Sequence, residues 1–175
     1  TNLLHIVQAA ASLRNSPHLS KREQFHMLAL HYLVNNEHRR ALATLHELLE
    51  VCPGDAFGLS LALDVASALG DRGGALRAAT SVAAYWNERA KRTLTGQTAM
   101  PGHAVGSSLI AVGFAIGGRY REAEQIVERT KRKDTMGSPG LAVWALAHVY
   151  DAEGRISEGA SQLSGYDGIQ DFADC

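Results

Sequence analysis

One pattern recurs four times in this sequence and limits the folds open to the chain: a glycine or an asparagine stands five residues before a small residue. The clearest copy runs from Gly117 to Glu124. The four pairs are Asn36 with Ala41, Gly70 with Ala75, Gly118 with Ala123, and Gly154 with Gly159. Glycine and asparagine tolerate the left-handed conformation that ends a helix, and a small side chain lets two helices pack closely. Each copy therefore predicts a tight turn between two antiparallel helices.

The spacing of the copies predicts a repeat. The four small residues are separated by 34, 48 and 36 residues. Thirty-four is the period of the tetratricopeptide repeat, whose unit is a helix pair that buries its apolar faces by stacking on its neighbours. The middle spacing is 14 residues longer, which indicates an insertion at Arg92–Gly102. We therefore expect an all-α fold, a tetratricopeptide-type α-solenoid of about four helix pairs.

The spacing of the repeats also predicts where the parts of the chain begin and end. The expected parts are 1–19 as an N-terminal helix and linker, repeats over 20–163 (about 22–55, 56–89, 104–137 and 140–163, with an insertion at 90–103), and a truncated tail at 164–175. Ser20 and Glu23 form a predicted capping box at the start of the first unit. Asp55 is placed to cap the helix that follows it. Both ends of the chain look cut, which favours a fragment of a longer protein.

Composition and charge exclude several classes of protein. Hydrophobic residues make up 46% of the chain but aromatic residues only 6%, a balance that favours closely packed helices. The formal net charge of −1 provides no field for nucleic acid or an anionic membrane, and no apolar run reaches the roughly 20 residues of a membrane span. Cys52 and Cys175 lack metal-site spacing and favour a reducing compartment. These observations predict a cytoplasmic protein with neither nucleic acid nor membrane as partner.

Several short segments in a fixed order carry a family resemblance. They are Arg22–His26, Cys52–Asp55, Asp64 with Leu69–Gly70, Gly118–Glu124, Trp144–Tyr150, Glu153–Arg155 and Glu158–Gly159. Together they resemble the tetratricopeptide repeat protein 38 family over about residues 20–163. The resemblance implies an all-helical, cytosolic solenoid with no assigned activity or partner. His26, Asp64 and His148 match the family pattern, whereas Trp144 stands where that pattern would place a second histidine.

Repeat geometry also assigns candidate binding residues. In a tetratricopeptide unit, positions two, five, nine and twelve of the first helix face a concave groove. These positions hold His26, Phe57, Asp64, Ser108, Trp144, His148 and Asp151. Two interpretations are open: a polar pocket in the groove that binds a peptide, a small molecule or a metal, or His–Asp hydrogen bonds that satisfy buried polar groups between units.

No catalytic or metal motif accompanies these residues. His26 and His31 are five residues apart and lie on different helix faces, whereas zinc sites show close ligand pairs such as i and i+4. Gly106, Ser107 and Ser108 do not make a nucleophile turn. The sequence therefore predicts a non-enzymatic scaffold without metal or cofactor, whose groove binds a protein or peptide partner. The alternative is a small-molecule or metal-dependent activity in a polar His/Asp pocket.

Overall fold

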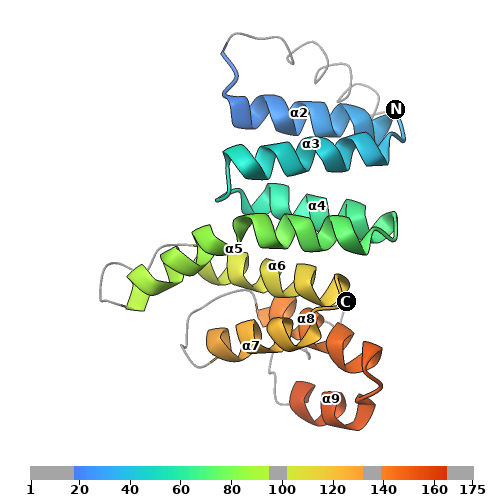
Figure 1. Cartoon of the computed structure of the whole chain (residues 1–175), viewed down its shortest axis with the longest axis vertical. Coiled ribbons are helices and arrows are strands. Elements are labelled where there is room, and N and C mark those ends of the chain that lie inside the picture. Colours follow the sequence, from blue (N-terminus) through green and yellow to red (C-terminus); the bar gives the residue numbers. More distant parts are fainter. Residues whose placement is uncertain (1–17, 95–101, 132–138, 165–175) are drawn as a thin grey trace.

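The structure is a computed structural model that describes residues 18–94, 102–131 and 139–164. Within these ranges every regular element is an α-helix and no strand occurs, which confirms the all-α class. The helices are α2 (Lys21–Val34), α3 (His38–Val51), α4 (Ala56–Ala68), α5 (Arg72–Leu94), α6 (His103–Ile116), α7 (Tyr120–Lys131), α8 (Pro139–Ala152) and α9 (Ile156–Leu163). Figure 1 shows α2 to α6 following one another along the longest axis of the molecule, with α7, α8 and α9 at the far end. We call α2, α4, α6 and α8 the first helices and α3, α5, α7 and α9 the second helices.

Four turns join a first helix to a second helix with one hydrogen-bond pattern. Their central residues have positive φ: 59° at Asn36, 65° at Gly70, 81° at Gly118 and 69° at Gly154. In each turn the next amide donates to the carbonyl five residues earlier at 2.8 Å: Glu37 to Tyr32, Asp71 to Ala66, Arg119 to Phe114, and Arg155 to Tyr150. This is the Schellman motif, which satisfies the last carbonyls of the first helix. The four predicted turns are confirmed.

The small residue that follows each turn lies in a close helix contact. Ala41, Ala75 and Ala123 are fully buried. At the fourth turn the corresponding Gly159 is also buried, and a Cβ built on it would come within 2.9 Å of the Cβ of Tyr150 on α8. Small side chains at these positions let each second helix approach its first helix closely, as the pattern predicts.

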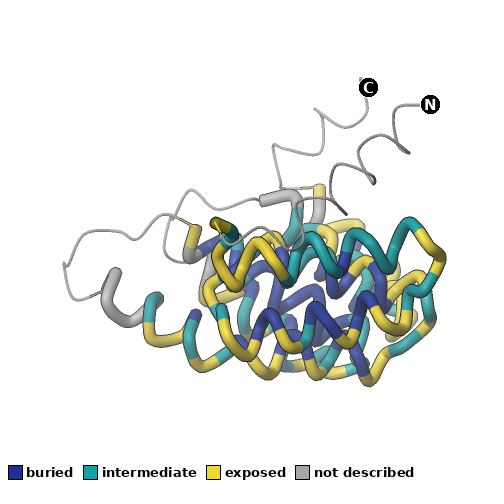
Figure 2. Tube along the Cα trace, turned by 90° about the horizontal axis from the view of Figure 1, so that it is seen from above, coloured by how far each residue is buried: buried dark blue, intermediate teal, exposed yellow. Residues whose placement is uncertain are grey.

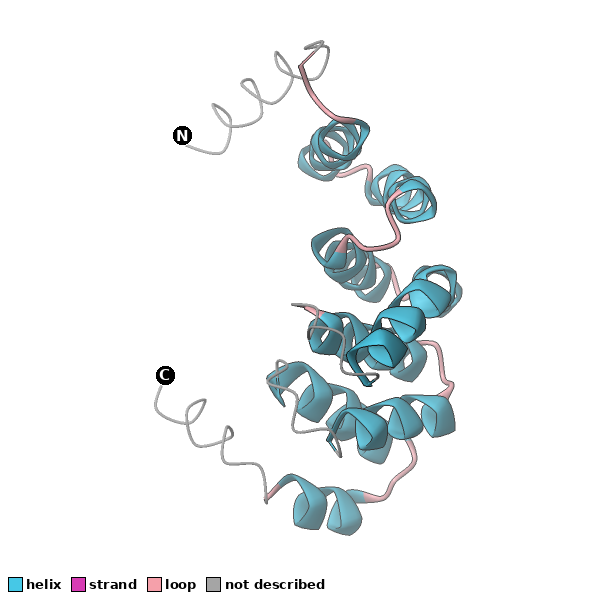
Figure 3. Cartoon of the chain, turned by 90° about the vertical axis from the view of Figure 1, so that its left-hand side faces the viewer, coloured by secondary structure: helices cyan, strands magenta, loops and turns pink. Residues whose placement is uncertain are grey.

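Each helix packs on its neighbours in the chain, and α3, α4, α5, α6 and α8 also contact a helix two places away. The contacts run α2–α3, α3–α4, α4–α5, α5–α6, α6–α7, α7–α8 and α8–α9, with additional contacts α3–α5, α4–α6 and α6–α8. In Figure 3 the helices from α2 to α5 alternate between two columns. The largest fully buried side chains are Leu45, Leu48, Leu49, Leu59, Val82, Val127, Leu146 and Val149. Figure 2 shows the buried residues gathered between the helices, with exposed residues around them.

Helix α6 is enclosed more completely than the other first helices. It contacts α4, α5, α7 and α8, and residues 108–115 are all buried. A Cβ built on Gly106 would clash with the indole of Trp86, and one on Gly113 would come within 2.6 Å of the Cβ of Ala79. Both glycines therefore let α5 lie directly against α6.

The boundaries differ from prediction mainly at α5. This helix has 23 residues and continues to Leu94, beyond the predicted end at residue 89, so the predicted insertion at 90–103 begins within the helix. Residues 90–94 contain neither glycine nor proline, so nothing in them ends a helix. None of the described helices is both long enough and apolar enough to cross a bilayer. The predicted N-terminal helix and nearly all of the predicted tail lie outside the described residues.

Candidate binding surface on the first helices

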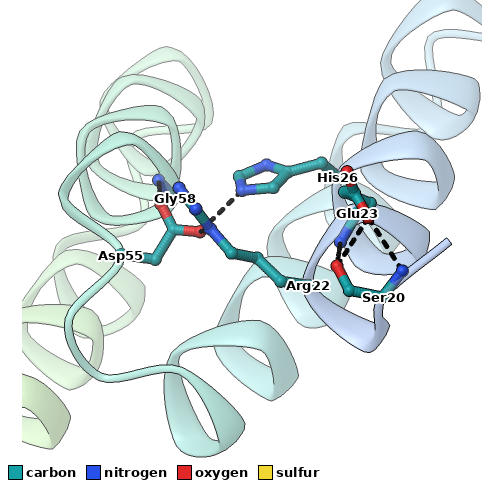
Figure 4. A network of polar contacts seen from close by, with 6 residues as sticks. All are labelled: Ser20, Arg22, Glu23, His26, Asp55 and Gly58. Carbon is teal, nitrogen blue, oxygen red and sulfur yellow. Dashed lines mark hydrogen bonds and ion pairs between the residues drawn. The ribbon is translucent and has the colours of Figure 1, made fainter.

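The best-connected candidate residue is His26, whose partner is Asp55 at the start of α4. Asp55 follows the turn at Pro53–Gly54 and caps α4: its Oδ1 accepts a hydrogen bond from the Gly58 amide at 2.8 Å. Its Oδ2 accepts from Arg22 Nε at 2.6 Å and from His26 Nε2 at 2.7 Å (Figure 4). The Asp55 side chain is fully buried. One carboxylate therefore caps α4 and ties it to α2.

The start of α2 places Arg22 and His26, the two side-chain donors to Asp55, on one face of the helix. Ser20 and Glu23 form the predicted capping box: the Glu23 amide donates to Ser20 Oγ at 3.3 Å, and the Ser20 amide donates to Glu23 Oε2 at 2.8 Å (Figure 4). The Ser20 hydroxyl also donates to Glu23 Oε2 at 2.7 Å, and this bond, followed by that from the Ser20 amide, lowers the pKa of Glu23. Arg22 and His26 are four residues apart, so they share the helix face that looks toward Asp55.

The charges in this cluster favour an ionised Asp55. Burial raises the pKa of this carboxyl, but the hydrogen bonds from Arg22, Gly58 and His26 together outweigh burial, and the pKa lies below its ordinary value. The hydrogen bond to Asp55 raises the pKa of Arg22. Asp55 is therefore a partnered structural anion, and the hydrogen bond of His26 is of the kind that satisfies polar groups between units.

The polar pocket centred on His26, Asp64 and His148 is not assembled. Phe57 lies beside His26, with ring centroids 5.3 Å apart. Asp64 is exposed. It follows Phe57 by seven residues in α4, which separates the two by about 10 Å along the helix axis. Figures 1 and 3 place α2, which carries His26, and α8, which carries His148, at different levels of the stack. The structure does not bring these three residues together, because the helices that carry His26 and His148 lie at different levels.

The remaining candidates lie on α6 and α8. Trp144 is 47% exposed, and its ring is parallel to that of His148, with centroids 5.5 Å apart and planes 1° apart. Asp151 is exposed about one turn beyond His148. Ser108, in contrast, is 2% exposed, because α6 is enclosed by four helices. We call Phe57 with Asp64 the α4 stripe, and Trp144 with His148 and Asp151 the α8 stripe.

A charge pattern that the sequence interpretation missed separates α4, α6 and α8 from α3, α5 and α7, although α2 and α9 do not follow it. Helices α4, α6 and α8 contain no lysine and no arginine, and their only carboxylates are Asp64 and Asp151. The second helices α3, α5 and α7 all carry arginine. The signal was present in the sequence, since comparing the charges of alternate helices reveals it. Both stripes therefore combine an exposed aromatic ring with a carboxylate.

Other features offer little chemistry. Among the described residues, no group of three His, Cys, Asp or Glu side chains is placed to hold a metal ion. An open depression of about 350 Å³ beside the cap of α4 is lined by Arg22, Cys52, Pro53, Gly54, Asp55 and Tyr85. Its carboxylate is the buried Asp55, which is already bonded to three donors.

The comparisons with known proteins find no relatives for this chain: no family model, no curated protein and no solved structure matches it. The resemblance to the tetratricopeptide repeat protein 38 family stays a prediction. What can be said of function depends on the geometry of the two stripes.

Proposed function

We propose that this protein is a non-enzymatic, tetratricopeptide-type scaffold that binds a segment of a partner protein on the exposed faces of its first helices. The repeated Schellman turns, the buried small residues and the alternation of helices support the repeat assignment. We also propose that the chain is a divergent relative of the tetratricopeptide repeat protein 38 family. Its low cysteine content, two in 175 residues, supports a cytoplasmic location.

The observation that carries the proposal is the exposure of Phe57 and Trp144. They are 64% and 47% exposed in a chain with few aromatic residues, and both lie on first helices. Large aromatic side chains provide much of the binding energy at protein interfaces. The contacts give less support to the alternative activity in a His/Asp pocket, because His26 is bonded to Asp55 and His148 packs on Trp144.

A capture experiment with matched variants tests the proposal. The immobilised chain is incubated with cytosolic extract, and bound proteins are quantified by mass spectrometry for the wild type and for the double variant Phe57→Ala with Trp144→Ala. The matched control is Val51→Ala with Ile156→Ala, which removes side chains that are 54% and 60% exposed on second helices. Circular dichroism confirms that all three proteins are folded.

We expect the aromatic variant to lose a partner that the control retains. A hot-spot residue contributes about 2 kcal/mol, which is roughly thirty-fold in affinity. A partner retained by both variants, or lost equally by both, contradicts binding on the first helices.

A further inference from the structure

We propose that the segment bound on the α8 stripe is basic, with one Lys or Arg side chain on the indole of Trp144 and a second paired with Asp151. This inference rests on the proposed function and specifies the chemistry of the partner. It depends on two independent features of α8, the environment of the indole and the environment of the carboxylate.

The indole of Trp144 is positioned to receive a cation. His148 lies parallel to the ring, and nearly half of the tryptophan is still exposed. Tryptophan is the aromatic side chain that attracts Lys and Arg most strongly, because its ring face is negative. A guanidinium group can stack on the uncovered part of the indole, and the parallel imidazole limits the rotation of the ring.

The carboxylate of Asp151 has no cation of its own in the described part of the chain. No hydrogen bond or ion pair joins its side chain to another described residue, and α8 contains no lysine or arginine. Arg155 follows closely in sequence but pairs with Glu124, Glu153 and Glu158 at 2.6–2.7 Å. Asp151 is therefore an exposed anion available to a partner.

The distance between the two features matches an extended peptide. Trp144 and Asp151 are seven residues apart, which places them on one face of α8 about 10 Å apart. In a polyproline-type extended chain, residues three positions apart lie on one side and about 9 Å from each other. A segment with basic residues at every third position can therefore reach both groups when it lies along α8.

The α4 stripe repeats the same combination in Phe57 and Asp64. Helices α4, α6 and α8 lack lysine and arginine and carry Asp64 and Asp151. These three helices complement a basic segment by charge, whereas α2 carries Lys21 and Arg22. The same carboxylates would repel nucleic-acid phosphates or an acidic peptide, so these occupants are disfavoured.

The inference can be tested with the protein's own fluorescence. The chain has two tryptophans, and Trp86 is only 3% exposed, so a neutral quencher such as acrylamide acts mainly on Trp144. Three peptides of equal length are added, with arginine, glutamate or serine at every third position in one glycine–serine background. We expect the arginine peptide to protect Trp144 from quenching and the protection to weaken with added salt.

Two variants locate the charge contact. Asp151→Asn should weaken binding of the arginine peptide roughly two- to fivefold, the range of an exposed ion pair. Glu47→Gln, which removes an exposed carboxylate from the second helix α3, should leave binding unchanged. Equal effects of the two variants would overturn the inference.

The three peptides also separate this inference from the proposed function. Protection by the serine or glutamate peptide to the same degree as by the arginine peptide overturns the basic-segment inference, while binding on the first helices stands. Protection by none of them also overturns the inference, and the capture experiment then decides the proposed function independently.

Discussion

Replacing Asp55 with alanine should destabilise the stack more than the loss of a helix cap alone. Alanine removes the acceptor for the Gly58 amide and also the shared partner of Arg22 and His26. The connection between α2 and α4 therefore weakens at the same time as the start of α4.

The expected cost follows from the three bonds. Loss of an N-cap costs about 1 kcal/mol. Loss of the bond between the largely buried His26 and a carboxylate costs about 1.5 kcal/mol. The Arg22 side chain is 58% exposed, so its ion pair contributes only about 0.5 kcal/mol. The free energy of unfolding of Asp55→Ala should thus be lower by about 3 kcal/mol.

Urea denaturation followed by circular dichroism measures this difference, and Asp71→Ala is the matched control. Asp71 accepts from the Gly74 amide at 2.8 Å in the same N-terminal position, but no hydrogen bond or ion pair joins its side chain to a second helix pair in the described structure. Its loss should cost about 1 kcal/mol. Asp55→Asn should fall between the two, because asparagine caps well but carries no charge. Equal destabilisation by Asp55→Ala and Asp71→Ala would refute the claim that Asp55 ties α2 to α4.

Three further predictions concern single positions. The Nε2 of His46 lies 3.1 Å from the carbonyl oxygen of Gly74, and burial lowers the pKa of this imidazole. The unfolded state therefore binds more protons than the folded state. The free energy of unfolding should fall as the pH drops below about 6.5. His46→Gln should show a shallower pH dependence in the same denaturation assay. Asn36→Gly should raise the unfolding free energy by about 0.5 kcal/mol, because glycine adopts positive φ without strain; a lower melting temperature contradicts this. Gly106→Ala should lower the free energy of unfolding by about 2 kcal/mol, because the added methyl group overpacks against Trp86. The near-ultraviolet circular dichroism of that indole should change as well. A variant with the melting temperature and the spectrum of the wild type contradicts the close contact.

The turns and the helix caps could be predicted from the sequence, because each depends on residues that are close together in the chain. A positive φ after a helix requires glycine or asparagine, and Asn36, Gly70, Gly118 and Gly154 all have this conformation. The caps at Ser20 and Asp55 depend on residues three positions away, so a short window of sequence contains the information they need.

Features that depend on neighbouring units could not be predicted in this way. Asp55 was interpreted as a cap alone, because its two other partners, Arg22 and His26, lie 33 and 29 residues away in the sequence. Ser108 was assigned to the groove by its position in the repeat, without knowledge that four helices enclose α6. The end of α5 was set by the repeat length rather than by a stop signal, and the helix continues to Leu94.

The enclosure of α6 has a consequence for how the chain can be divided. In an ideal repeat protein each unit contacts only its neighbours, so the array can be shortened one unit at a time. Helix α6 contains no Asp, Glu, Lys or Arg and is covered from both directions along the chain. A fragment that ends at residue 117 would leave one side of this apolar helix open to solvent, and such surfaces cause aggregation. The halves before and after α6 therefore depend on each other for solubility, and synthesis of the chain must reach α8 before α6 is sheltered.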